Sequence, residues 1–263
     1  MKGYTAILLL VFVLLLMSCK PTDEEKAAVR LNNAKFLLEK GDTINALLQL
    51  DSISFYPEAK YAANAAKNLA IEINFSLLKR KEIELDSLKT KIAFVETAFD
   101  KEKTEFDRYT QYIHKKQNQQ NALGRSFIKI QVDERGTIFL SSNYFGKSVL
   151  NHYALRVYDG EISAKTDSVP VGSPENHQSE FLDYKWEKVM YLNGKDAGVV
   201  QFIADNADRK LKAVFIGRQQ QFIELAPWDK QAAKDAIALA DALRKRTELQ
   251  NEIKNLQSKI PAQ

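Results

Sequence analysis

The spacing of hydrophobic residues divides the chain into helical flanks and a β-rich middle. Apolar residues recur every three or four positions from about residue 24 to residue 123 and again after residue 227, which is typical of amphipathic helices. Between these flanks, apolar and polar residues alternate in short runs broken by turns, as in antiparallel strands. Eight of the ten glycines lie between Gly124 and Gly217. The pattern therefore predicts an α+β fold in which helices flank an antiparallel β domain.

Residues 19–77 form the first helical segment. Gly41 ends one predicted helix, because glycine readily adopts the left-handed conformation that follows a helix C-terminus, and Asp42 or Thr43 can cap the next helix. Four residues resemble part of a tetratricopeptide repeat, whose small residues let paired helices pack closely: Gly41, Asp42, Ala46 and Pro57. Only about one and a half such repeats are visible, and a plain helical bundle is the alternative.

Two further segments, 78–123 and 227–263, keep a heptad spacing that predicts coiled-coil helices. The apolar positions of the first are Leu85, Leu88, Ile92, Val95, Phe99, Phe106, Tyr109 and Ile113. Those of the second are Leu239, Ala242, Leu249, Ile253, Leu256 and Ile260. The economical arrangement is an antiparallel pair of long helices, and two separate helices packed on the body are the alternative. Heptads do not decide whether such helices pair within one chain or between chains.

Residues 124–226 predict seven or eight short antiparallel strands, arranged as a β-sandwich or an open barrel. Asp159-Gly160 and Asn193-Gly194 are dipeptides that favour hairpin turns. A further turn is predicted from Asp133 to Gly136, and the apolar run from Val199 to Ile203 is assigned to a strand.

The first 18 residues have the pattern of a signal peptide. Lys2 precedes an unbroken apolar run of 11 residues, Ile7 to Met17, which is too short to span a bilayer but suits a signal-peptide core. The run ends in Leu16-Met17-Ser18-Cys19, which resembles the lipobox of bacterial lipoproteins, although Met17 departs from the small residue favoured there. The resemblance implies cleavage before Cys19, a diacylglyceryl thioether on its sulfur and an acyl chain such as palmitate on its new amino group. An ordinary cysteine closing a secretory signal is the alternative.

The residue after the cysteine bears on the location. Lys20 stands where enteric lipoproteins retained in the inner membrane have Asp, so the resemblance implies an outer-membrane lipoprotein, facing either the periplasm or the cell surface. Taken whole, the chain resembles uncharacterised lipoproteins of Bacteroidota. The segments that carry this resemblance are Arg125-Ser126-Phe127, Val132-Asp133-Glu134-Arg135-Gly136, Leu150-Asn151-His152 and Asp196-Ala197-Gly198-Val199-Val200. It implies an address and a layout, and no known activity.

Composition and motifs exclude several classes of function. The 38 basic and 34 acidic residues leave a net charge of +4, too small and too evenly spread to predict nucleic-acid binding. The single cysteine excludes an internal disulfide and multi-cysteine metal or redox motifs. The sequence has none of the motifs of zinc proteases, serine hydrolases, phosphate-binding loops or calcium loops. We therefore expect no cofactor, no metal site and no enzymatic activity.

Three histidines and two acids remain as candidates for chemistry. His114 is expected at the end of the heptad helix, where a cation complements the helix dipole, and His177 lies in a polar loop. His152 precedes an alternating strand and is a candidate ligand-binding or catalytic residue. Asp183 and Glu187 could pair across the sheet as glycosidase carboxylates do, although ordinary surface acids are the simpler interpretation.

Aromatic residues crowd the β domain. They form the core of any small sheet, but an aromatic face can also stack on a sugar ring or receive a peptide. Tyr184 and Trp186, together with His152, are the candidate ligand-binding residues.

These observations favour a lipid-anchored interaction or scaffold protein of the cell envelope, which presents a β module on a coiled-coil stalk. Its partners would be the membrane, through the lipid on Cys19, and a protein partner or a second copy of the chain. The alternative is a glycan- or peptide-binding lipoprotein of an envelope uptake system. A hydrolase with an unfamiliar site is the third hypothesis.

Overall fold

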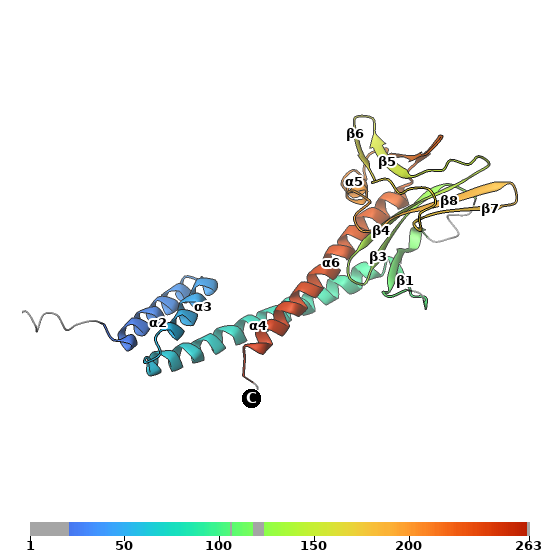
Figure 1. Ribbon diagram of the computed structural model, residues 1–263. Coiled ribbons are helices and arrows are strands. Elements are labelled where there is room, and N and C mark those ends of the chain that lie inside the picture. Colours follow the sequence, from blue (N-terminus) through green and yellow to red (C-terminus); the bar gives the residue numbers. More distant parts are fainter. Residues whose placement is uncertain (1–20, 106, 118–123, 262–263) are drawn as a thin grey trace, which may run out of the picture. The chain divides into compact units, whose positions relative to one another are not determined.

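The computed structural model describes residues 21–105, 107–117 and 124–261 (Figure 1). The predicted signal peptide, the lipobox-like segment with Cys19 and the heptad residue Phe106 therefore lie outside the described residues. In chain order the elements are α2 (Asp23–Glu39), α3 (Thr43–Asp51), η1 (Ser52–Phe55), α4 (Lys60–Glu96), β1 (Phe99–Glu102), β2 (Gln111–His114), η2 (Lys115–Gln117), β3 (Phe127–Asp133), β4 (Ile138–Gly146), β5 (Ala154–Asp159), β6 (Ile162–Lys165), β7 (Asn176–Phe181), β8 (Tyr184–Tyr191), α5 (Val199–Asp205), β9 (Lys212–Ile216), β10 (Gln220–Glu224) and α6 (Pro227–Ser258).

The strands form two antiparallel sheets, which confirms the α+β prediction. One sheet has six strands in the order β1-β2-β3-β4-β8-β7, and the other has four in the order β10-β9-β5-β6. Within the described ranges neither sheet closes into a barrel. The predicted Asp159-Gly160 turn joins β5 to β6, whose last pair is Asp159 with Ile162.

The chain divides into two compact units, and the boundary falls within α4 and again within α6. The first unit takes in the described residues up to Glu82 and from Glu252 onward, and the second takes in Ile83–Asn251. Helices α4 and α6 therefore each contribute one end to each unit.

Local capping signals set the helix ends of the first unit, and Gly41 and Asp42 act as predicted. Glu25 and Thr22 form a reciprocal capping box that begins α2. Gly41, with a φ of 78°, follows the end of α2, and the Asp42 carboxylate accepts a hydrogen bond from the Asn45 N–H (3.1 Å) at the start of α3. The core of this unit is made largely of alanines and is therefore thin: Ala27, Ala34, Ala46, Leu50, Ile53, Ala59, Ala62, Ala66 and Ile73.

The core of the second unit lies between the two sheets and α6. Alternate residues of β3 (Ile128, Ile130 and Val132) point into it, and Leu239 and Leu243 of α6 cover it. The turn before β4 requires glycine, because Gly136 has a φ of 84° and a Cβ there would lie 2.4 Å from the Ala240 carbonyl oxygen.

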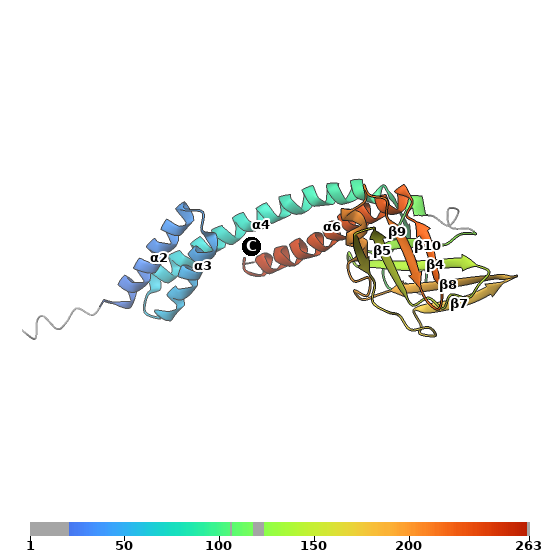
Figure 2. The ribbon, with the colours of Figure 1, turned by 90° about the horizontal axis from the view of Figure 1, so that it is seen from above.

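Within the second unit α4 and α6 run antiparallel, as the heptad pattern predicts (Figure 2). Ile92 of α4 is buried in the same core as Leu239 and Leu243 of α6, with Leu88 and Val95 packed against it. Leu88, Ile92, Val95 and Leu239 occupy heptad positions of the predicted seam, and Leu243 joins the core beside them.

The prediction of one continuous helix through residues 78–123 is wrong beyond Glu96. Strand β1 begins at Phe99, and β2 pairs it with His114 opposite Phe99. Phe99 and Ile113 are buried as the heptad predicts, but on strands. An apolar residue such as Phe99 fits both the buried stripe of a helix and the buried face of a strand. Pairing of β2 with β3 favours the strand in this segment.

The prediction of a strand from Val199 to Ile203 is also wrong. This segment is helix α5, whose buried residues Val199, Val200, Ile203 and Ala204 have helical spacing. Asn193 and Gly194 do form a turn with positive φ at both residues. The turn leads from β8 toward α5, so Asn193-Gly194 is not a hairpin.

Candidate functional site

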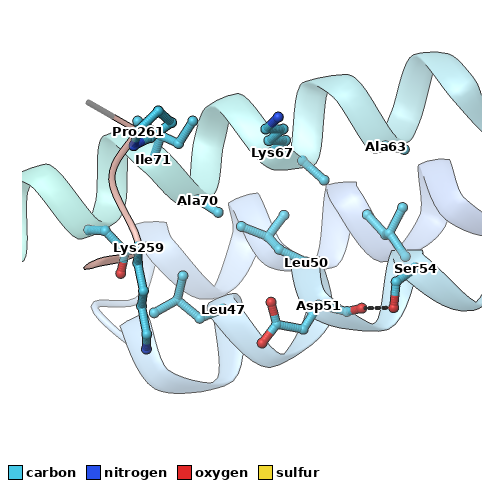
Figure 3. A pocket seen from close by; sticks show the side chains of 13 residues that line it. Leu47, Leu50, Asp51, Ser54, Ala63, Lys67, Ala70, Ile71, Lys259 and Pro261 are labelled. Carbon is cyan, nitrogen blue, oxygen red and sulfur yellow. Dashed lines mark hydrogen bonds between the residues drawn. The ribbon is translucent and has the colours of Figure 1, made fainter. Parts of the chain in front are cut away.

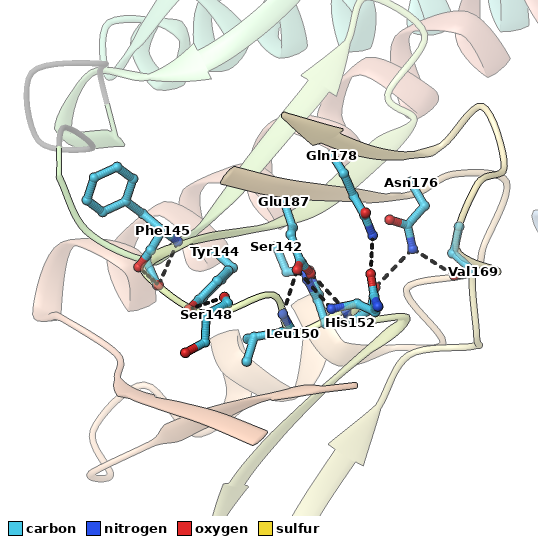
Figure 4. A network of polar contacts seen from close by, with 12 residues as sticks. Ser142, Tyr144, Phe145, Ser148, Leu150, His152, Val169, Asn176, Gln178 and Glu187 are labelled. Carbon is cyan, nitrogen blue, oxygen red and sulfur yellow. Dashed lines mark hydrogen bonds and ion pairs between the residues drawn. The ribbon is translucent and has the colours of Figure 1, made fainter. Parts of the chain in front are cut away.

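One buried carboxylate holds the loop that precedes β5 (Figure 4). Glu187 lies on β8 and is 1% exposed. Its Oε1 accepts hydrogen bonds from the backbone N–H groups of Leu150 (2.7 Å) and Asn151 (2.8 Å), and its Oε2 accepts one from the N–H of His152 (2.9 Å). Three consecutive backbone donors therefore converge on a single side chain.

The imidazole of His152 completes the environment of this carboxylate. His152 Nδ1 lies 2.8 Å from Glu187 Oε2. Burial alone would raise the pKa of Glu187, but the hydrogen bonds from the His152 ring and from the loop backbone outweigh burial and lower the pKa below its ordinary value. The carboxylate is thus held in its charged form.

On its other side the imidazole contacts a serine. His152 Nε2 lies 2.9 Å from Ser142 Oγ, and Ser142 Oγ lies 2.9 Å from the hydroxyl of Tyr191. In a neutral imidazole, Nδ1–H donates to Glu187 and Nε2 accepts the hydroxyl proton of Ser142. Ser142, His152 and Glu187 therefore follow the hydrogen-bond order of a hydrolase triad.

Burial separates this arrangement from a working triad. Ser142, His152 and Tyr191 have no exposed surface. A catalytic serine must meet its substrate, and here the Ser142 hydroxyl is enclosed and also contacts Tyr191. The network as described fixes the 148–152 loop to β4 and β8.

Neighbouring residues extend this network. The Asn176 side-chain amide donates to the carbonyl oxygens of His152 (2.9 Å) and Val169 (3.1 Å). Gly217 lies directly against the loop, since a Cβ there would be 2.3 Å from the Leu150 carbonyl oxygen. The loop is therefore fixed from β7, β8 and the end of β9.

An aromatic cluster lies near the end of β4 and β8; we call it the aromatic corner, and it consists of Phe127, Phe145, Tyr184 and Trp186. Phe145 and Trp186 are directly paired across the two strands. The Phe145 ring stacks on Tyr184, with centroids 4.7 Å apart and planes 11° apart, and meets Trp186 edge-on at 5.7 Å. Tyr184 is 39% exposed, and Trp186 is half-buried. The corner thus combines a packed base with an accessible face.

A groove of about 240 Å³ lies beside Trp186. Its lining mixes apolar Val149 with the polar residues Gln178, Ser179, Glu180, Lys185 and Glu187. Glu180 and Lys185 form an ion pair across β7 and β8. Trp186 and Glu187 are consecutive on β8, so the ring of Trp186 and the groove side chains on the face of Glu187 point to opposite sides of the sheet. The groove and the aromatic corner are therefore two separate surfaces beside the β7 edge.

Strand β7 is the terminal strand of the six-stranded sheet, and its residues His177, Gln178, Ser179 and Glu180 are all exposed. Long, exposed edge strands are usually protected by a proline, a bulge or several charges. Glu180 is the single charged residue of β7. This edge is therefore open to pairing with another strand.

Of the predicted ligand-binding residues, the structure brings Tyr184 and Trp186 together and places His152 behind them in the core. A surface ligand therefore does not reach His152 in this arrangement. Lipidation of Cys19 falls outside the described residues.

Two other assignments are corrected. Asp183 is exposed in the β7–β8 turn while Glu187 is buried against the loop, so the glycosidase-like pair is not seen. His114 does not end a helix: it is buried on β2, with Nε2 3.0 Å from Asp235 Oδ2 of α6. His177, in contrast, is exposed as expected, although on β7 rather than in a loop.

Ser142, Tyr191 and Asn176 take part in the site, although no sequence motif predicts a role for them. Ser142 occupies the buried face of β4 between Leu140 and Tyr144, where alternation calls for an apolar residue. A polar residue at such a position is a signal for a buried hydrogen bond. The identity of its partner depends on contacts that are distant in sequence.

No family model matches the chain, and no curated protein and no solved structure matches it either. Among the residues that the structure describes, no helix has the length and apolar character needed to cross a membrane. In the same part of the chain, no group of three or more His, Cys, Asp or Glu side chains is placed to hold a metal ion.

Proposed function

We propose that this chain is a lipid-anchored, non-enzymatic interaction protein of the cell envelope, whose β domain binds an extended segment of a partner protein along β7. The observation that carries the proposal is the open edge of β7 next to the aromatic corner and the groove. The enclosed Ser142–His152–Glu187 network supports the non-enzymatic part, because its polar groups contact one another rather than solvent.

The backbone of β7 presents free hydrogen-bonding groups at regular spacing. The Met190 N–H donates to the Glu175 carbonyl oxygen (2.8 Å) at the start of the β7–β8 ladder. In an antiparallel ladder the hydrogen-bonding direction alternates, so the N–H groups of Gln178 and Glu180 point away from β8. An incoming extended segment can accept these bonds and lengthen the sheet.

The side chains on the two faces of β7 and β8 supply the specificity that backbone pairing lacks. Alternate side chains of an added strand point to opposite faces of the sheet, and one row would lie near Trp186 and Tyr184. An apolar or aromatic side chain of the partner would be covered there, while the Glu180–Lys185 pair would favour a polar neighbour.

The anchor is tested separately from the β domain. Cys19→Ala removes the proposed acylation site, and we expect the protein to lose metabolic labelling by palmitate and to leave the membrane fraction. Lys20→Ala is the matched control and should keep both properties. Labelling that persists in Cys19→Ala would contradict the anchor.

The β7 edge is tested with a photo-crosslinking residue at Ser179 in the intact cell envelope. Glu180→Pro removes one outward N–H but leaves the β7–β8 ladder unchanged, because proline is tolerated at the solvent side of an edge strand. Glu180→Ala removes the same carboxylate and keeps the N–H. We expect a crosslinked partner that is lost in the proline variant and retained in the alanine variant; equal capture by both variants would count against strand addition.

Glycan binding is the second candidate, favoured by the exposed Tyr184 ring of the aromatic corner. The chain has two tryptophans, so Trp228→Phe leaves Trp186 as a reporter at the aromatic corner. Titration with soluble polysaccharides should quench its fluorescence, and Tyr184→Ala should abolish the effect. An unchanged signal with every glycan would leave strand addition as the better proposal.

A further inference from the structure

The first unit contains a larger groove, between α3 and α4 (Figure 3). Its volume is about 660 Å³. Three alanines on one face of α4 line it, Ala63, Ala66 and Ala70, and Leu47 and Leu50 of α3 point toward them. Small residues on one helix face over two turns let a further helix approach closely. We call this feature the α3–α4 groove.

A buried polar atom in this groove has no partner. Asn74 lines the groove and is 7% exposed, and its Oδ1 accepts no hydrogen bond. A buried carbonyl oxygen without a donor is destabilising, so its presence in a groove points to a donor from outside the unit. Charged groups surround the same opening: Lys67, Lys259 and Asp51, none of which forms an ion pair within the described ranges.

Helix α2 carries an exposed stripe of apolar, amide and acidic side chains. Val29 is 59% exposed and Phe36 57% exposed, and both lie on one face of the helix. Residues at spacings of four, three, four and three make up the α2 stripe: Glu25, Val29, Asn32, Phe36 and Glu39. The sequence of the stripe is acid, apolar, amide, apolar, acid. The Lys40 ammonium lies beside it, 5.5 Å from the Phe36 ring.

The α2 stripe faces away from its own unit. The other side of α2 is fixed in the unit's core by Ala27 and Ala34, which have no exposed surface. A helix that already buries one face in this way cannot also turn its other face into the groove of the same unit. The stripe and the groove can therefore meet only between two molecules.

We infer that the α3–α4 groove binds the α2 stripe of a second copy of this chain. Val29 and Phe36 would cover the alanine floor and the leucines of the groove, and the Asn32 carboxamide would supply the donor that Asn74 lacks. Glu25 and Glu39 complement the unpaired Lys67 and Lys259, and Lys40 complements Asp51. Apolar, amide and charged groups are thus matched in kind on the two surfaces, independently of what the β domain binds.

The test is self-association of the full chain in mild detergent, followed by sedimentation velocity over a range of concentrations. Phe36→Glu breaks the stripe, and Ala63→Gln with Lys67→Glu breaks the groove; all three positions are exposed, so the fold should persist with an unchanged circular dichroism spectrum. Each variant should weaken association at least about tenfold, as expected when burial of one large apolar side chain is lost. Phe94→Glu, at a 78% exposed phenylalanine in the second unit, is the matched control and should associate like the parent chain.

Mixing the stripe variant with the groove variant distinguishes this specific contact from nonspecific association. The Phe36→Glu chain keeps an intact groove, and the groove variant keeps an intact stripe, so a mixture of differently tagged copies should form a complex that neither forms alone. Asn74→Leu should weaken association as well, and it should not lower the unit's own stability. A chain that stays monomeric at every concentration, association that ignores both variants, or a mixture that restores nothing would each overturn the inference.

Discussion

The Glu187 network of the second unit and the α3–α4 groove of the first differ in how their buried polar groups are paired. In the second unit the Glu187 carboxylate receives three backbone N–H groups and the His152 ring, and the chain of contacts continues through Ser142. A buried amide oxygen lacks a donor in each unit, Asn74 Oδ1 in the first and Asn176 Oδ1 beside the His152 network in the second, and that of Asn74 lines the α3–α4 groove. A satisfied network rigidifies a fold, whereas an unsatisfied polar atom in a groove marks an incomplete surface.

The hydrophobic cores of the two units also differ, in the size of the side chains that they enclose. The second unit encloses large side chains such as Phe215, Tyr191 and Leu155 between its sheets. The first relies on alanines and leaves Phe36, Ile44 and Leu48 exposed. Clustered exposed apolar residues on a small unit indicate contact with another surface. This difference agrees with the two roles proposed above, a structural one for the His152 network and a binding one for the α3–α4 groove.

The largest expected effect is that of removing the carboxylate from the His152 network. Glu187→Leu leaves three backbone donors and a histidine buried without their acceptor, and we expect a loss of about 3–5 kcal/mol in the free energy of unfolding. Glu180→Ala breaks an exposed ion pair and should lower the free energy of unfolding by at most about 1 kcal/mol. Urea denaturation followed by tryptophan fluorescence measures both, and similar losses for the two variants would refute the distinction.

Acid should weaken the same network. The pKa of Glu187 is lower in the folded protein than its ordinary value of 4.5, so the unfolded chain takes up a proton more readily than the folded one. The stability contributed by Glu187 is therefore fully present above about pH 4.5 and is lost as the pH falls through the folded pKa. Urea midpoints at a series of acidic pH values should fall less steeply for Glu187→Gln than for the parent chain; parallel slopes would show that another group is responsible.

Ser142→Ala tests whether the triad-like order has a structural or a chemical meaning. The change leaves His152 Nε2 and the Tyr191 hydroxyl without their shared partner, and we expect a loss of about 1–3 kcal/mol. A fluorophosphonate reagent should leave the parent chain unlabelled, because Ser142 is enclosed. Labelling that disappears in Ser142→Ala would reveal an accessible nucleophile and would overturn the structural interpretation.

The smallest expected effect is a gain in stability rather than a loss. Asn74→Leu removes a buried carbonyl oxygen without a donor, and we expect a gain of about 1 kcal/mol in the free energy of unfolding. Asn64→Leu is the matched control, since Asn64 is exposed on the same helix and undergoes the same change in helix propensity. Thermal unfolding by circular dichroism compares the two. A loss of stability specific to Asn74→Leu would mean that the carboxamide already has a partner in the isolated unit.

Much of the candidate site could be anticipated, but not its organisation. The aromatic content of the β domain points to Tyr184 and Trp186, and the structure brings both against Phe145 in the aromatic corner. His152 was selected for the same surface and instead lies in the core. Its contacts with Glu187 span 35 residues of sequence, and no local pattern reports a contact at that separation.

Local patterns sufficed for the helices of the first unit, the α+β class and the Asp159-Gly160 hairpin, because caps, helix stops and strand alternation act within a few residues. Only the tertiary structure decided that Phe99 begins a strand, that Val199 begins a helix and that Ser142, His152 and Glu187 meet. The local sequence around Phe99 and Val199 is compatible with both helix and strand, and that around Ser142, His152 and Glu187 does not say which partner each side chain meets. The choice between them belongs to the distant segment that buries it or completes its hydrogen bonds.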